Sequence, residues 1–157
     1  MHTPAANHKT TWPDALTAPQ PERIQQCLAA FWRELAALPE LHTRGEQLLM
    51  AELTARLRGL LLEMMLALNG IGRPPATRHL NGYLGQSQRT AIEATLIAPA
   101  ANGDAWLGQA VALLVIYRWY APQLVEKYGL TYPQALETAT WNQLCDLPDW
   151  PISVTTA

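Results

Sequence analysis

The polar side chains best suited to bind a ligand gather in one stretch, residues 69–89. Guanidinium, imidazole, amide and phenol groups alternate there and offer many hydrogen-bond donors to an anionic or polar ligand. We therefore predict a pocket or partner surface in this stretch. The alternative is a solvated corner in which Arg78 and His79 bond local carbonyl groups. The candidate binding residues are Asn69, Arg73, Arg78, His79 and Tyr83.

Arg73 and His79 are separated by five residues. This spacing resembles the Arg-x4–6-His motif of HEPN-type ribonucleases, in which the two side chains flank a phosphodiester at a dimer seam. The resemblance implies an alternative function, an RNA-cleaving enzyme that uses Arg73 and His79.

Sequence motifs of the common enzyme classes are absent from these 157 residues. There is no GxGxxG, GxxxxGK[ST], GxSxG or HExxH pattern. The four histidines are scattered, and no group of His, Cys and Asp has the spacing of a metal site. A nucleotide-transferring palm domain needs a Gly-Ser turn and paired metal-binding aspartates, and neither Gly-Ser nor Asp-x-Asp occurs. We expect no catalytic residue, no metal, no cofactor, and no nucleotide transfer by this chain alone.

Only 15 % of the residues are charged, against roughly a quarter in typical proteins, and the net charge is −2. A phosphate backbone attracts excess positive charge, so this balance argues against a nucleic-acid partner. The longest apolar run, residues 110–117, is shorter than the ~20 residues of a membrane span. Cys27 and Cys145 are interpreted as reduced core thiols of a cytoplasmic protein, with a single disulfide as the alternative.

Apolar residues at intervals of three and four predict helices along most of the chain from Pro21 onward. Pro39 is expected to end the first helix, and Thr43 with Glu46 to form a capping box for the second. Pro122 is expected to kink or split the longest helix near Tyr120. The predicted helices span about residues 21–38, 43–68, 77–84, 87–96, 104–128 and 131–144, with a loop over 98–103.

These elements predict an all-α protein, an up-and-down helical bundle of about five main helices with two short inserted helices. Apolar residues make up 49 % of the chain, which is enough for a packed core. Residues 1–20 are expected to form a flexible N-terminal arm with Trp12 as its one anchor. Residues 21–145 are expected to form the bundle, and residues 146–157 an irregular tail.

Two charged residues inside the predicted helices, Glu63 and Arg118, each allow two interpretations. Glu63 shares a helix face with Arg56, so it is expected to be solvated or paired with that residue. Arg118 stands between two aromatic residues and is expected to extend toward solvent from a helix end. The alternative for Arg118 is a cation–π stack at a ligand.

The predicted helix over residues 104–128 is apolar around nearly its whole circumference. A surface helix needs an apolar stripe of only about 100°, so this helix must be covered on every side. We predict a homodimer or an obligate complex built on this helix, with Trp119 in the interface. The alternative is a monomer in which the helix is central.

Five segments follow one another in this order: Phe31-Trp32, Arg44-Gly45-Glu46, Leu66-Ala67-Leu68-Asn69, Pro74-Pro75 and Arg78-His79-Leu80-Asn81-Gly82-Tyr83-Leu84. The arrangement, over about residues 22–145, resembles the helical C-terminal half of antibiotic nucleotidyltransferases of the lincosamide and aminoglycoside type. That half belongs to the HEPN-like, kanamycin nucleotidyltransferase C-terminal class. The resemblance implies a helical domain that lines a substrate pocket and forms a dimer, beside a palm domain that binds nucleotide and metal. It points to Asn69, Arg78, His79 and Tyr83 as pocket or partner residues.

We therefore expect a non-catalytic helical substrate-binding or dimerisation module, related to these C-terminal halves and lacking the catalytic palm. Such a module would self-associate, bind a small polar molecule, or dock a separate nucleotidyltransferase subunit. The alternatives are a HEPN-type ribonuclease that uses Arg73 and His79, and a purely structural dimer.

Overall fold

The protein, described by a computed structural model, is all-α over the residues that the structure describes, 12–96 and 103–151. Those residues form six α-helices and one 3-10 helix and contain no strand. The all-α prediction is confirmed. The elements are α1 (Pro21–Leu35), α2 (Leu38–Arg44), α3 (Gln47–Leu68), η1 (Leu80–Tyr83), α4 (Gln86–Ala94), α5 (Gly103–Tyr128) and α6 (Gln134–Leu144).

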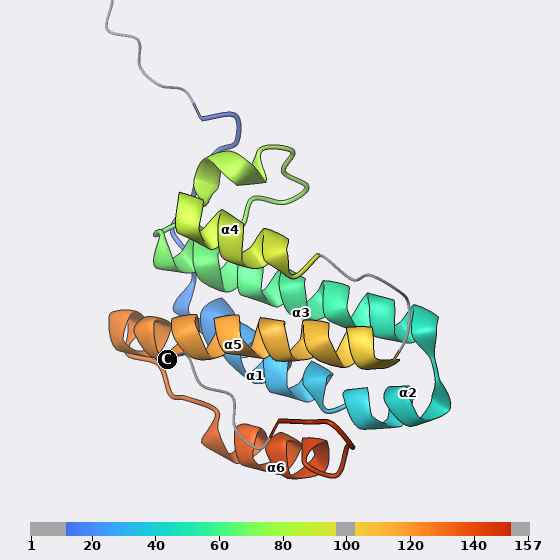
Figure 1. Cartoon of the computed structure of the whole chain (residues 1–157). Helices are drawn as coiled ribbons and strands as arrows, with labels where there is room; N and C mark the ends of the chain where they lie inside the picture. Colours follow the sequence, from blue (N-terminus) through green and yellow to red (C-terminus); the bar gives the residue numbers. More distant parts are fainter. Residues whose placement is uncertain (1–11, 97–102, 152–157) are drawn as a thin grey trace, which may run out of the picture.

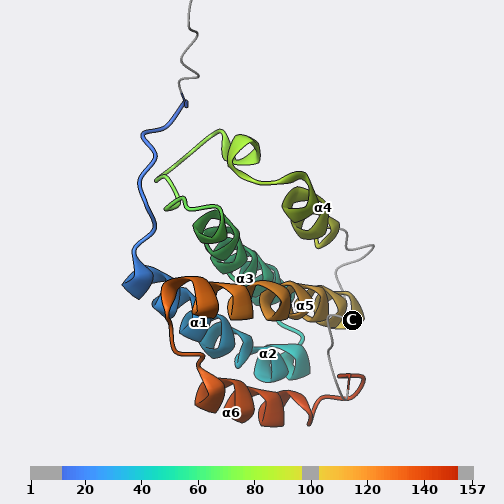
Figure 2. The ribbon, with the colours of Figure 1, turned by 90° about the vertical axis from the view of Figure 1, so that its left-hand side faces the viewer.

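Helices α3 and α5 run side by side in the same direction through the middle of the molecule (Figure 1). Near their starts, Trp106 Nε1 of α5 donates a hydrogen bond to Gln47 Oε1 of α3. At their ends, the Tyr128 hydroxyl donates to the Ala67 carbonyl over 2.6 Å. Figure 2 confirms the order of the stack: α4 and α6 lie at opposite ends, with α3, α5 and α1 between them.

A cluster of three aromatic rings joins α1 to α5 in the core. The rings of Phe31 and Tyr117 stack with their centres 4.3 Å apart, and Trp32 meets Tyr117 edge to face at 5.4 Å. The side chains of all three are fully buried. The Tyr117 hydroxyl donates to the Leu28 carbonyl over 2.9 Å, so the buried polar end of the ring has a partner.

The apolar surface of α5 is covered largely within the single chain, by α3 with help from α1 and α4. Trp119 is the one large apolar side chain of α5 that is exposed, at 54 %. The single chain therefore supplies most of the cover that the sequence assigned to a partner, and the face around Trp119 stays uncovered. None of the helices in residues 12–96 and 103–151 has the length and apolar character needed to cross a membrane.

The first helix ends earlier than predicted, at Leu35, and Pro39 lies in the first turn of α2 instead of ending a helix. Proline suits a first helical turn because the N–H that it lacks has no partner within the helix there. The predicted capping box is wrong. Thr43 Oγ1 donates to the Pro39 carbonyl within α2, over 2.9 Å, and Glu46 precedes α3 without a capping bond from its side chain. Gly45, at φ 66°, provides the left-handed residue that ends α2.

Pro122 does not split α5, which continues to Tyr128. Pro122 is exposed, so its ring faces solvent instead of displacing core side chains. Tyr120, Ala121 and Leu124 stay buried on either side of it, and this packing keeps the helix in one piece.

Arg118 is half-buried, contrary to the expectation that it extends to solvent. Its Nη2 donates to Glu137 Oε1 of α6 over 2.8 Å, and its guanidinium carbon lies 5.0 Å from the centre of the Trp141 ring. The cation–π contact considered for a ligand is thus made to a tryptophan of the same chain. Arg118 joins α5 to α6.

The segment 12–20 lies against the end of α3 and the loop that follows it. The Gly72 N–H donates to the Thr17 carbonyl over 2.8 Å. The Trp12 and Tyr83 ring centres are 5.7 Å apart, so Trp12 makes the anchoring contact that the sequence predicted.

Three predictions fall partly outside the described residues. The structure does not describe residues 1–11 of the predicted arm, residues 98–102 of the predicted 98–103 loop, or residues 152–157 of the predicted tail. Within the described part of the tail, residues 146–149 form turns and a bend, and residues 150 and 151 have no regular secondary structure.

We predict that Tyr117→Phe lowers the free energy of unfolding by about 1 kcal/mol, because it removes a buried hydrogen bond while keeping the stacked ring. Urea denaturation measures this. Tyr120→Phe is the matched control on the same helix, since the Tyr120 hydroxyl makes no hydrogen bond with the described residues, and it should change stability by less than about 0.5 kcal/mol. Equal losses in the two variants would contradict this account of the core.

Candidate functional site

Helix α3 ends in a left-handed turn that begins the loop carrying the candidate residues. Gly70 has a φ of 79°, and the N–H groups of Gly70 and Ile71 donate to the carbonyls of Ala67 and Leu66 over 3.0 and 2.9 Å. This closure requires a positive φ, which glycine adopts without strain. The turn sends the chain back beside α3, and Arg73 comes to lie against that helix.

Asn69 fixes the geometry of the site through an amide pair. Its Nδ2 donates to Gln88 Oε1 over 2.7 Å and to the Tyr83 carbonyl over 3.0 Å, and its Oδ1 accepts from Gln88 Nε2 over 3.1 Å. Gln88 Oε1 also accepts from the Gly85 N–H over 2.9 Å, which closes the start of α4. The predicted binding residue Asn69 therefore positions η1 and α4 relative to α3.

Asp14 connects the N-terminal segment to the loop. The Thr77 and Tyr83 hydroxyls each donate to Asp14 Oδ2 over 2.6 Å. These bonds stabilise the charged carboxylate. The Thr77 bond has the larger effect, and together with the Tyr83 bond it lowers the pKa of Asp14 below its ordinary value of 3.8. Burial, with help from the carboxylate, raises the pKa of Tyr83, so its hydroxyl stays protonated and can donate.

An open cavity of about 540 Å³ lies between this segment and η1; we call it the aromatic hollow, and it is lined by Trp12, Pro13 and residues 77–83. Arg78 and His79 are exposed on it, and the Trp12 ring is 52 % exposed. The hollow thus presents two basic side chains beside an indole face. Three predicted site residues meet here: Arg78, His79 and Tyr83.

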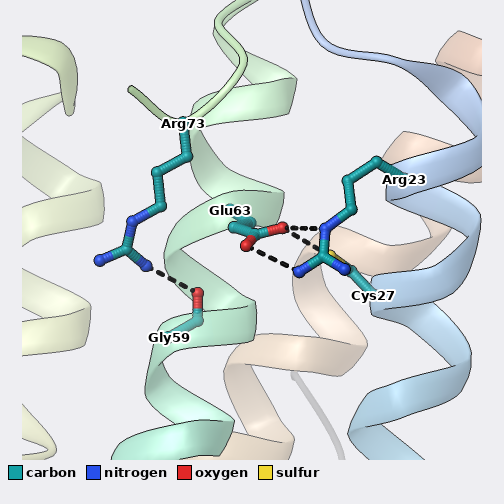
Figure 3. A network of polar contacts seen from close by, with 5 residues as sticks. All are labelled: Arg23, Cys27, Gly59, Glu63 and Arg73. Carbon is teal, nitrogen blue, oxygen red and sulfur yellow. Dashed lines mark hydrogen bonds and ion pairs between the residues drawn. The ribbon is translucent and has the colours of Figure 1, made fainter. Parts of the chain in front are cut away.

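A second group of polar contacts lies between α1 and α3 (Figure 3). Arg23 holds the Glu63 carboxylate with two hydrogen bonds, Nε to Oε2 at 2.8 Å and Nη2 to Oε1 at 2.9 Å. The Cys27 thiol donates to Glu63 Oε2 over 2.9 Å. The predicted pairing of Glu63 with Arg56 is wrong, since Arg56 bonds Glu34 of α1 instead.

Cys27 is a buried, protonated thiol. Burial, followed by its contact with the Glu63 carboxylate, raises the pKa of Cys27 to about 12. A thiol in this state is a poor nucleophile, because the reactive form is the thiolate. Both cysteines are free, and Cys145 is exposed, so the prediction that it is a core thiol is wrong.

Arg73 reaches α3 from the loop after it. Its Nη1 donates to the Gly59 carbonyl over 3.2 Å. Arg23 and Arg73 lie on opposite sides of the Glu63 carboxylate (Figure 3). The Arg73 charge helps to lower the pKa of Glu63, after the Arg23 and Cys27 hydrogen bonds, and these effects together exceed the opposing effect of burial.

The structure divides four of the predicted site residues between two cavities, and Asn69 lines neither of them. Arg73 lines a cavity with Arg23 and Glu63, whereas His79 lines the aromatic hollow, and the two cavities share no lining residue. The Arg73–His79 pair of the ribonuclease hypothesis is therefore not brought to one cavity. In the described residues, no group of three or more His, Cys, Asp or Glu side chains could hold a metal ion.

Sequence reasoning missed Asp14 and Arg23 as parts of these sites, and it placed Gln88 in the polar stretch 69–89 without identifying its pairing with Asn69. Asp14 was assigned to a flexible arm, and its partners lie more than 60 residues away in the chain. The sequence offered one signal, the carboxyl, amide and hydroxyl side chains that lie near two aromatic residues, Trp12 and Tyr83. That signal does not identify partners.

Comparisons with family models, with curated proteins and with solved structures found no match for this chain.

We predict that the Asp14 pKa lies below 3.8 and rises most in Thr77→Val, less in Tyr83→Phe and least in His79→Gln, in the order of their effects. Carbon-13 NMR of the side-chain carboxyl across a pH series measures it. Because the folded-state pKa is lowered, these contacts stabilise the folded protein above about pH 4, and the stabilisation is lost as the pH falls through the folded-state value. An Asp14 pKa at its ordinary value in all four proteins would contradict the contact.

Proposed function

We propose that this chain is a non-catalytic helical binding module whose aromatic hollow takes a small anionic molecule carrying a flat ring. The observation that carries the proposal is the meeting of Arg78 and His79 with the exposed Trp12 ring in one cavity of about 540 Å³. That volume is within the range of small-molecule pockets, roughly 300–1,000 Å³.

The charges of the hollow favour an anion. Arg78 is a permanent cation with five N–H donors in a fork that suits carboxylate or phosphate oxygens. His79 adds a ring nitrogen donor. The Asp14 carboxylate is nearby, but it is not among the residues that line the hollow, and the Thr77 and Tyr83 hydroxyls both donate to its Oδ2. The indole face of Trp12 offers a stacking surface for a flat ring.

We keep a relationship to nucleotidyltransferase C-terminal halves as part of the proposal, but the charges of the hollow change the ligand that we expect. Aminoglycosides carry several ammonium groups, which Arg78 would repel. We therefore propose an anionic ligand instead of a cationic antibiotic. A separate nucleotidyltransferase subunit remains a proposed partner.

The test is a titration of the ¹⁵N-labelled full chain with phenyl phosphate. The Trp12 indole N–H and the backbone amides of Arg78 and His79 should shift. Arg78→Gln should weaken binding about tenfold, which is the loss of one charge-assisted hydrogen bond. His79→Ala should weaken binding as well.

Two matched probes separate charge from ring stacking. Cyclohexyl phosphate lacks the aromatic face and benzyl alcohol lacks the charge, and both should bind more weakly than phenyl phosphate. His79→Ala should leave the melting temperature within about 5 °C, because the side chain is exposed. Shifts confined to other residues, or equal binding by the Arg78→Gln protein, would overturn the proposal.

We also propose self-association through the exposed face of α5, with a second copy of this chain as the occupant. Trp119 lies one helical turn from Pro122, and an apolar hollow formed by Pro122, Val125 and Tyr132 with Glu126 adjoins it. Glu126 is the one charged residue among these, so the face can meet its own copy in a two-fold dimer with little charge repulsion.

Light scattering at micromolar concentration tests the dimer. The expected mass is twice 17.4 kDa, and Trp119→Glu should reduce it to a single chain. Gln86→Glu, which adds the same charge at an exposed polar position of α4, is the matched control and should leave the mass unchanged. A wild-type mass of one chain would rule out the dimer.

A further inference from the structure

A groove separate from the aromatic hollow runs between α1, α3 and the N-terminal segment. We call it the arginine groove. Its outer part has a volume of about 210 Å³ and its inner part about 40 Å³. Both parts are lined by Gln20, Arg23, Glu63, Gly72 and Arg73, so they are two depths of one cavity.

The outer part carries one uncompensated positive charge. Arg23 and Glu63 neutralise one another through two hydrogen bonds at 2.8 and 2.9 Å. The Cys27 thiol beside them is protonated, because its pKa is raised to about 12. The remaining positive charge is that of Arg73. Only one of its five N–H donors is used, in the hydrogen bond to the Gly59 carbonyl.

The inner part is apolar and small. Ile24, Met64, Ala67 and Ile71 line it beneath the charged rim. A volume of about 40 Å³ holds roughly three water-sized groups, which matches a short alkyl chain and is too small for an aromatic ring.

We propose that the arginine groove binds a small aliphatic monocarboxylate, with the carboxylate on the free edge of Arg73 and the alkyl chain in the inner apolar part. A guanidinium fork matches the two oxygens of a carboxylate. A dianionic phosphate ester fits less well, because the groove offers a net charge of only one. This site does not depend on the function proposed for the aromatic hollow.

The segment 17–20 makes the groove possible. The Thr17 carbonyl accepts the Gly72 N–H over 2.8 Å, and the absent side chain of Gly72 allows this close approach, since an added Cβ would lie 3.3 Å from Ala18 O and from Thr17 Oγ1. The segment is held by this backbone hydrogen bond and therefore forms one wall of the groove, which Arg73 also lines.

Isothermal titration of the full chain with sodium butyrate tests the proposal. Butyramide has the same shape without the charge, and benzoate has the charge with a ring in place of the alkyl chain. Butyrate should bind, and the other two should bind at least about tenfold more weakly.

Arg73→Gln should weaken butyrate binding by at least about tenfold, and Arg78→Gln, the same change at the aromatic hollow, should leave it unchanged. Both arginines are exposed, and circular dichroism should show folded proteins in both cases. Equal losses in the two variants would mean general attraction to the protein's charge and would overturn the proposal. Failure of wild-type butyrate binding, or equal binding of butyramide, would overturn it as well.

Discussion

The pairing of α3 with α5 is the constraint on which the rest of the structure depends. Helix α5 is apolar around most of its surface, and α3 lies beside it along its length, with hydrogen bonds joining both pairs of ends. The Lys127 ammonium donates a further hydrogen bond of 2.7 Å to the Leu68 carbonyl. Side chains at the end of α5 therefore bind carbonyls at the end of α3 that have no donor within their own helix. Once these two helices are paired, α1 and α4 complete the cover, and α6 closes over α1.

This arrangement collects the polar side chains at one end of the molecule. Helix α3 ends beside the end of α5, and the loop that follows turns back at Gly70 and carries Arg73 to one cavity and residues 77–83 to the other. The N-terminal segment then forms a wall of both cavities, through Trp12 in the aromatic hollow and Thr17 in the arginine groove. Both proposed sites depend on the docking of one segment that contains no helix.

The sequence predicted the helical class and the extensive burial of the helix that became α5, because apolar residues at helical intervals leave a direct pattern in the sequence. It also identified Arg78, His79 and Tyr83, which share one cavity. It could not predict the partners of Glu63 or Asp14, because Arg23 and Thr77 come from other elements, and tertiary packing alone decides such pairs. The helix end expected at Pro39 and the split expected at Pro122 are wrong, because proline is compatible with a first helical turn and with a solvent-facing helix surface.

Hydrogen exchange at the Gly72 amide tests most directly whether the N-terminal segment is docked. This N–H donates to the Thr17 carbonyl, whereas the amide of the next residue, Arg73, makes no hydrogen bond within the described residues. After correction for intrinsic rates, the account predicts that Gly72 exchanges at least about tenfold more slowly than Arg73. Exchange of both amides at the rate of an unstructured chain would mean that the segment is not docked, and neither cavity would have the wall on which its proposed ligand depends.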